Sequence, residues 1–136
     1  MHPTPRLTDR LRRPAAHLAV ALVVTGAVGL AACGADEQPD LSAAAARGRD
    51  VAAGSGCAGC HGGSGEGGVG PAWTGLAGST VQLDDGSTVT ADADYLHRSI
   101  VDPGAEVVAG YTLQMPQNQL SDDEAAAVVA YIQELG

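Results

Sequence analysis

The stretch Cys57-Ala58-Gly59-Cys60-His61 is the most informative part of this chain. On one helical turn, two thiols at this spacing can form thioethers to the two vinyl groups of one haem, and the following histidine reaches the iron from the same side. The pentapeptide therefore predicts one covalently attached haem, held by Cys57 and Cys60, with His61 as an iron ligand. So short a motif also occurs by chance, and the rest of the sequence has to support it.

Residues 1–32 have the layout of an export signal. Four arginines and one aspartate precede an apolar run that ends in Leu30-Ala31-Ala32-Cys33. A charged segment, a short apolar segment and small residues at a cleavage site are typical of a signal peptide. Because the cysteine after Leu-Ala-Ala resembles the lipobox of bacterial lipoproteins, we expect a lipid on Cys33. Two alternatives stay open: cleavage near Ala32 without lipid, and an uncleaved membrane helix over residues 15–32.

The export signal supports the haem motif, since haem is joined to such motifs on the outer side of a membrane. With lipid on Cys33 and haem on Cys57 and Cys60, each of the three cysteines has a role. We expect the protein on the outer face of the bacterial cytoplasmic membrane, on the periplasmic side or the cell surface. Residues 33–41 would form a lipid-tethered linker, which spans at most roughly 30 Å.

Residues 42–136 have the length of one small domain with few large apolar side chains. The only aromatic residues of the chain are one tryptophan and three tyrosines, and phenylalanine is absent. So few large side chains make a thin core for a domain of this size. A buried haem would fill the core, and we expect the protein without haem to fold poorly.

The chain beyond residue 32 is strongly acidic. It has three arginines, no lysine and fifteen aspartates and glutamates, which give a formal charge of −12. This balance excludes nucleic acid as a partner. Solubility of an exported protein and docking to a basic protein both remain as explanations of the acidity.

Helical patterns dominate this domain, so we expect an all-α fold of three to four helices around the haem, with a short hairpin. A serine precedes the first helix, and Ser-Asp-Asp-Glu forms a capping box before the last one. The Asp-Gly pair between two short runs rich in threonine and valine is typical of a hairpin turn. The expected elements are a helix from Ser42 past Val51, a hairpin of residues 80–83 and 87–90, a helix over residues 95–101 and a helix from Ser121.

Residues 62–70 are rich in glycine, with six glycines among nine residues. Such loops can hold phosphate, but that motif needs a preceding strand and a following Gly-Lys-Ser/Thr, and this sequence offers neither. We expect instead a tight turn against a flat cofactor, where side chains would collide.

Met115 is the candidate for the second iron ligand. It is the only methionine beyond the export signal, lies 54 residues after His61 and is followed by Pro116. A thioether is a ligand that suits haem iron and raises its potential. His97 is the rival candidate, although its place beside Arg98 in an expected helix has an ordinary surface explanation.

From about residue 48 to residue 135 the chain resembles a class I c-type cytochrome. It is most similar to the cytochrome c domain at the C-terminus of some bacterial cytochrome c oxidase subunit II proteins. The similarity lies in an ordered set of short landmarks. They are Cys57-Ala-Gly-Cys-His61-Gly, Gly70-Pro71, Gly75-Leu76-Ala-Gly78, Asp85-Gly86, Ala91-Asp92, Tyr95-Leu96, Ser99-Ile100, Asp102-Pro103, Gly110-Tyr111, Met115-Pro116, Leu120-Ser121 and Tyr131-Ile132.

The resemblance implies further roles. The carbonyl of Pro71 would accept a hydrogen bond from the second ring nitrogen of His61, and Gly48 would let Tyr131 pack closely across the first helix. Trp73 and Tyr111 would line the haem pocket, by packing or by reaching a propionate. The chain departs from the family at two positions: Ala52 replaces a usual aromatic residue, which should weaken the contact between the terminal helices, and Trp73 replaces a common leucine.

The resemblance also implies an electron carrier rather than an enzyme. It would pass single electrons between redox proteins, with a donor such as a quinol–cytochrome c reductase, an acceptor such as a terminal oxidase, and no small-molecule substrate. A haem-carrying subunit of a larger oxidase or dehydrogenase complex is the alternative. The chain has no room for a copper domain, so we do not expect oxidase activity from it alone. A thiol–disulfide oxidoreductase would need a βαβ setting, which the pattern lacks.

Overall fold

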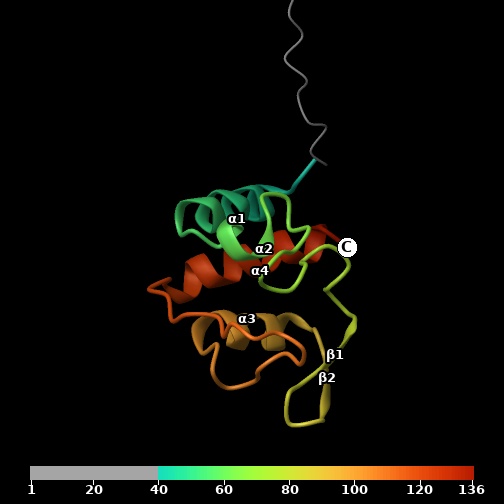
Figure 1. The fold of residues 1–136 in the computed structure, drawn as a ribbon. Coiled ribbons are helices and arrows are strands. Elements are labelled where there is room, and N and C mark those ends of the chain that lie inside the picture. The colour runs from blue at the N-terminus through green and yellow to red at the C-terminus, as the bar shows by residue number, and fades with distance from the viewer. Residues whose placement is uncertain (1–39) are drawn as a thin grey trace, which may run out of the picture. The chain divides into compact units, whose positions relative to one another are not determined.

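The computed structural model describes residues 40–136, so the predicted signal peptide, most of the predicted linker and Cys33 lie outside the described residues. The described part is mostly helical and has one short hairpin, as the sequence predicts (Figure 1). Its elements are helices α1 (Ala43–Gly54), α2 (Ala58–His61), α3 (Ala93–Val101) and α4 (Asp122–Glu134), and strands β1 (Thr80–Gln82) and β2 (Thr88–Thr90).

Helix α1 begins where the sequence predicts. The side chain of Ser42 accepts a hydrogen bond from the backbone N–H of Ala45, at 3.2 Å, and so satisfies a free donor of the first turn. The buried residues Ala45, Gly48 and Ala52 follow at intervals of three and four. All three therefore lie on one face of the helix, and their small side chains allow a neighbouring helix to come close.

Helix α4 has the predicted capping box. Ser121 Oγ accepts from the backbone N–H of Glu124, and the Glu124 carboxylate accepts from the backbone N–H of Ser121. Three acidic residues in the first turn also face the positive end of the helix dipole. The buried side chains of α4 include Val128 and Ile132, which place this helix in the core.

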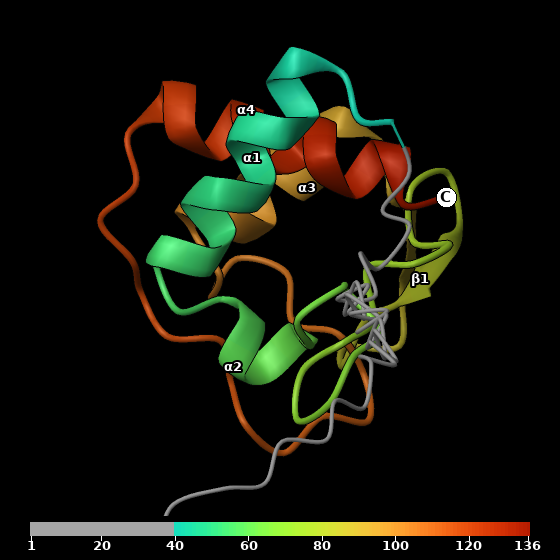
Figure 2. The same ribbon diagram turned by 90° about the horizontal axis from the view of Figure 1, so that it is seen from above.

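Helices α1 and α4 cross closely at Gly48 (Figure 2). A Cβ atom at position 48 would overlap the backbone carbonyl of Ala127 and would lie 3.0 Å from Cβ of Tyr131. Only glycine fits this contact without a shift of one backbone. The prediction that Gly48 lets Tyr131 pack across the first helix is confirmed.

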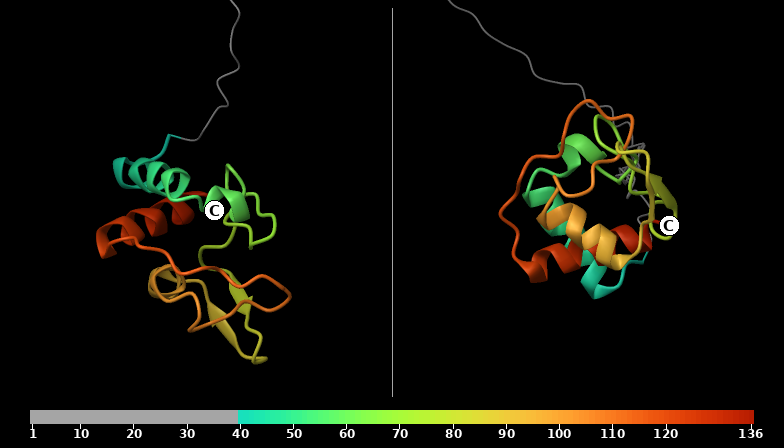
Figure 3. Two further views of the ribbon diagram at one scale, coloured as in Figure 1. Left: turned by 60° about the vertical axis from the view of Figure 1, so that its left-hand side comes forward. Right: turned by 90° about the horizontal axis from the view of Figure 1, so that it is seen from below.

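Helix α3 lies on the side of α4 that faces away from α1 (Figure 3). It begins at Ala93, two residues earlier than predicted. The reason is a cap that the prediction missed: the side chain of Asp92 accepts from the backbone N–H of Tyr95, at 2.8 Å. The two added residues do not change the buried face of the helix, which carries Tyr95, Leu96 and Ile100.

The hairpin is confirmed, with strands one residue shorter than predicted at the turn. Strands β1 and β2 pair antiparallel, with Val81 opposite Val89. Gly86 has a φ of 87°, which the turn requires and which glycine adopts without strain. Leu83 donates its backbone N–H to the carbonyl of Ser87 across the turn, at 2.9 Å, and also forms an antiparallel bridge with Val108. The hairpin is therefore joined to the segment after α3.

The core contains few large side chains, as the composition predicts. The largest side chain that is fully buried is Val128. Trp73, Tyr95 and Tyr131 supply most of the aromatic packing. Within residues 40–136, no helix combines the length and the apolar character needed to cross a membrane.

Candidate haem-binding site

The short helix α2 carries the CxxCH motif. Cys57 precedes the helix, and its carbonyl accepts from the backbone N–H groups of Cys60 and His61, at 3.1 and 3.0 Å. Both cysteines are free thiols of intermediate exposure. The helical turn thus keeps two thiols and one imidazole on a single rigid element, which is the arrangement that thioether attachment requires.

Burial raises the pKa of the Cys57 thiol, and the neighbouring Cys60 adds to the effect. The nucleophilic cysteine of a thiol–disulfide oxidoreductase has a lowered pKa, because the thiolate does the chemistry. The shift at Cys57 has the opposite direction. It gives no support to the oxidoreductase alternative.

His61 is held by two contacts on the chain. Its Nδ1 lies 2.7 Å from the carbonyl oxygen of Pro71. With the proton on Nδ1 in this hydrogen bond, the lone pair of Nε2 is left for a metal. The ring also stacks on Trp73, with 4.7 Å between ring centroids and 20° between planes. The structure therefore orients the buried imidazole through a carbonyl and an aromatic face.

The glycine-rich segment of residues 62–70 folds back over the end of α2. The N–H groups of Gly67 and Gly70 donate to the carbonyls of His61 and Cys60, at 2.7 and 3.0 Å. A Cβ on Gly70 would lie 3.1 Å from Cε1 of His61. The glycines were expected to turn against a flat cofactor. In the structure they turn against the helix and the imidazole, and so satisfy carbonyls that the end of α2 leaves free.

Two adjoining cavities lie between α2, α3 and the segment before α4. Their volumes are about 390 and 430 Å³, and His61, Ile100 and Met115 line both. Cofactor sites usually have roughly 300–1,000 Å³. The sequence-derived site residues come together here: Pro71, Trp73, Tyr111, His61 and Met115 line the first cavity, and Cys57, Cys60, His61 and Met115 line the second.

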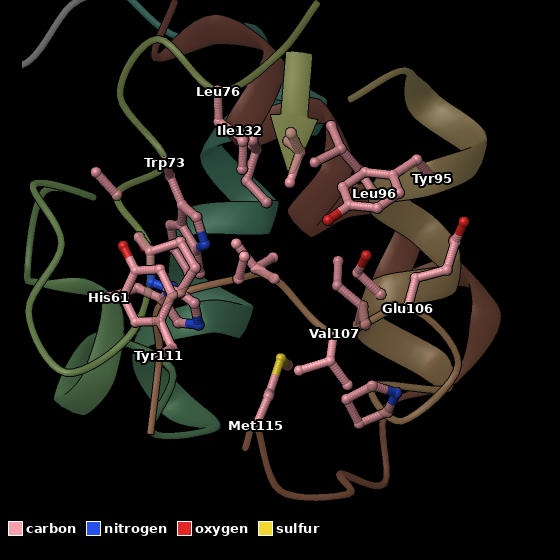
Figure 4. Close-up of a pocket in the computed structure, with 18 of the residues that line it drawn as sticks. His61, Trp73, Leu76, Tyr95, Leu96, Glu106, Val107, Tyr111, Met115 and Ile132 are labelled. Atoms are coloured by element: carbon pink, nitrogen blue, oxygen red, sulfur yellow. The ribbon is translucent and has the colours of Figure 1, made fainter. Parts of the chain in front are cut away.

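Met115 reaches the cavity from the segment that joins α3 to α4. Figure 4 shows its sulfur directed inward, while His61 enters from a different wall. The amide of Asn118 donates to the carbonyl of Ile100 at 2.6 Å, which ties this segment to the end of α3. His97, the rival ligand, lines neither cavity in the part of the chain that the structure describes.

The cavity also contains polar groups that the sequence did not indicate. Tyr95, Ser99 and Glu106 line it from α3 and the loop that follows. The Ser99 hydroxyl is buried without a hydrogen-bond partner. An isolated hydroxyl in a mostly apolar cavity next to two free thiols fits a large, flat, apolar group that has a polar edge, as haem does. Two signals could have revealed Tyr95 and Ser99: their spacing of one helical turn, and their place among the landmarks of the resemblance.

Comparison with known proteins agrees with this geometry. The family model described as Cytochrome c matches residues 45–136, which include both cavities and all four helices except the first two residues of α1. No curated protein matches the chain. Proteins of the matched family are electron carriers that bind haem c covalently, typically one per domain. The chain therefore belongs to the cytochrome c family and has the small class I fold, with Cys57 and Cys60 in its CxxCH motif.

Proposed function

We propose that the protein is a membrane-tethered electron carrier with a haem bound to Cys57 and Cys60 and ligated by His61 and Met115. The observation that carries the proposal is the cavity that His61 and Met115 both line, beside the two thiols. When bound, haem supplies the one-electron couple between ferric and ferrous iron. The chain supplies attachment, ligands and a dry environment.

Each proposed ligand has a defined task. Pro71 holds the Nδ1 proton of His61, which leaves Nε2 for iron and makes the imidazole more basic. Met115 offers a thioether, which favours ferrous iron and raises the potential. If His61 and Met115 both held the haem iron, they would leave no open position for a substrate, and the haem would supply electron transfer alone.

The ligand assignment can be tested by Met115→Ala. We expect the methionine–iron band in the near-infrared spectrum of the oxidised protein to disappear and the midpoint potential to fall, because a soft ligand is lost. Thr112→Ala is the matched control, since Thr112 is exposed in the same segment and lines neither cavity. An unchanged spectrum in Met115→Ala, together with a changed haem spectrum in His97→Ala, would overturn the assignment.

Attachment to the membrane rests on the sequence of residues 1–33. We propose that the export signal is removed and that Cys33 becomes the lipidated N-terminus, on the outer face of the bacterial cytoplasmic membrane. Mass spectrometry of the mature N-terminus should show the lipid, and Cys33→Ser should release the protein from the membrane fraction. A mature N-terminus without lipid, or one that begins at a residue other than Cys33, contradicts the proposal.

The partners follow from charge and family. A redox protein with a basic face would complement the formal charge of −12 of residues 33–136. We propose a donor such as a quinol–cytochrome c reductase and an acceptor such as a terminal oxidase. A pull-down from solubilised membranes tests this: transient, salt-sensitive capture supports a free carrier. A stable complex that survives high salt would instead support a haem-carrying subunit, as in the domain of oxidase subunit II that the sequence resembles.

A further inference from the structure

Two hydroxyl groups on α3, those of Tyr95 and Ser99, lie in the first cavity. Tyr95 is only 2% exposed, and Figure 4 shows its hydroxyl directed into the cavity. Ser99, one helical turn later, also lines the cavity and lies close enough to the phenol oxygen to act on it by hydrogen bonding. The buried Ser99 Oγ has no other partner among residues 40–136.

Two hydroxyls that can bond only to each other leave one proton without an acceptor, so a ligand that accepts a hydrogen bond would complete the site. A buried hydroxyl without a partner costs about 1–3 kcal/mol, so such groups are rare in folded proteins. Burial raises the pKa of Tyr95, and the carboxylate of Glu106 raises it further. The phenol therefore keeps its proton at neutral pH and can only lower its energy by donating it to an acceptor.

Haem offers one kind of acceptor at its edge, the two propionate carboxylates. The described residues that line the first cavity include no arginine or lysine to balance them. Arg98, on the same helix, is held by Glu106, with 3.0 Å between Nη2 and Oε2. Neutral donors are therefore what this cavity provides for a carboxylate.

We propose that the Tyr95 hydroxyl donates a hydrogen bond to a haem propionate and that the Ser99 hydroxyl donates to the oxygen of Tyr95. The proposal rests on the haem site described above and adds two positioning residues to it. Ser99 lies close enough to Tyr95 to lower the pKa of the phenol, which is the effect of a donor to the phenol oxygen. The relay would satisfy both hydroxyls and would spread part of the propionate charge onto the protein.

The relay should raise the midpoint potential, because a donor to the propionate weakens the negative charge that stabilises ferric iron. The main test is Tyr95→Phe, which removes the hydroxyl and keeps the ring. We expect a lower midpoint potential in redox titration and a shift of the propionate carboxylate bands in the redox-difference infrared spectrum. Tyr131→Phe is the matched control, because Tyr131 is a buried tyrosine that lines neither cavity. The midpoint potential of this variant should equal that of the wild type.

Ser99→Ala distinguishes a relay from two separate donors. Ser99 acts through Tyr95, so we expect a smaller fall in potential than for Tyr95→Phe. The double variant should have the same midpoint potential as Tyr95→Phe alone, because the Tyr95 hydroxyl through which Ser99 acts is already absent. If the fall in midpoint potential of the double variant equalled the sum of the falls in the two single variants, the relay would be overturned.

Two further results would contradict the proposal. An unchanged potential and unchanged carboxylate bands in Tyr95→Phe would exclude the propionate contact. A shift of the methionine–iron band in Ser99→Ala, with no change in the carboxylate bands, would place the hydroxyl on Met115 instead. All these variants keep Cys57 and Cys60, so each should still carry covalent haem even if the relay is wrong. A wild-type protein without covalent haem would instead overturn the proposed function itself.

Discussion

The crossing of α1 and α4 and the haem cavity are built in different ways. At the crossing, the protein satisfies its own contacts: Gly48 fits against the backbone of Ala127, and Val128 is fully buried. Around the cavity, the hydroxyls of Tyr95 and Ser99 have no hydrogen-bond partner among the described residues except each other. From this comparison we expect the polypeptide to complete the helix crossing by itself and to need haem to complete the other half of the fold.

The largest expected effect comes from Cys57→Ser/Cys60→Ser, which removes both attachment points. We expect complete loss of covalent haem, seen as no signal in a haem-stained denaturing gel. Hydrogen exchange should then show protection lost in α2 and α3 while α1 and α4 keep more of theirs, because only the cavity needs the cofactor. Cys33→Ser, with an intact motif, should retain haem. Equal loss of protection in all four helices would contradict the comparison.

Trp73 connects the two regions, so its truncation should affect both. The indole stacks on His61 at 4.7 Å and meets Tyr131 edge-on at 6.1 Å. For Trp73→Ala we expect the free energy of unfolding to fall by about 3–5 kcal/mol, since a large buried ring is removed. The spectrum of the oxidised protein should also change, because the imidazole of His61 loses its stacking partner.

Trp73→Phe provides the matched control, because it keeps an aromatic face against His61. Denaturant unfolding should show a smaller loss than in Trp73→Ala, and the spectrum should stay close to that of the wild type. If Trp73→Ala changes stability but leaves the spectrum untouched, the stack only fills space and does not orient the ligand.

Gly48→Ala tests the helix crossing alone. The added methyl group would overlap the backbone carbonyl of Ala127, which cannot move as a flexible side chain does. We expect a loss of roughly 1–3 kcal/mol in the free energy of unfolding, with an unchanged haem spectrum. Gly54→Ala is the control on the same helix, where no atom lies within 4 Å of an added Cβ. Alanine has the higher helix propensity, so Gly54→Ala should cause no loss. A loss in Gly54→Ala as large as in Gly48→Ala would show that the crossing does not set the effect.

The smallest expected effect concerns the start of α4. Ser121→Ala should lower the free energy of unfolding by about 1 kcal/mol, because the cap of the first turn is lost. Hydrogen bonds from the backbone and the side chain of Ser121 hold the pKa of Glu124 below its usual 4.5. This contribution is present above pH 4.5 and disappears as the pH falls through the lowered pKa. The difference in the free energy of unfolding between wild type and Ser121→Ala should therefore be smaller at acid pH than at neutral pH. A difference of the same size at both pH values would contradict the contribution of the Glu124 carboxylate to the capping box.

Much of this architecture could be predicted from local sequence. Ser42 and Ser121 marked the starts of two helices, and Asp85-Gly86 marked the hairpin turn, because caps and turns depend on a few neighbouring residues. The CxxCH motif and the lone Met115 likewise indicated residues that line the cavities in the structure. These features carry their chemistry in residue type and spacing.

What the sequence did not reveal depends on tertiary contacts. The pairing of Leu83 with Val108 and the bond from Asn118 to Ile100 join segments far apart in the chain. Tyr95 and Ser99 were read as ordinary helix residues, because helical periodicity shows which face is buried but not which cavity it borders. The stack of Trp73 on His61 was hidden for the same reason.

The most direct test of the central claim is mass spectrometry of the peptide that contains Cys57 and Cys60, taken from the protein purified from its native membrane. The account predicts the added mass of one haem on this peptide, with neither thiol open to alkylation. Two free thiols on an unmodified peptide, each alkylated after denaturation, would contradict it.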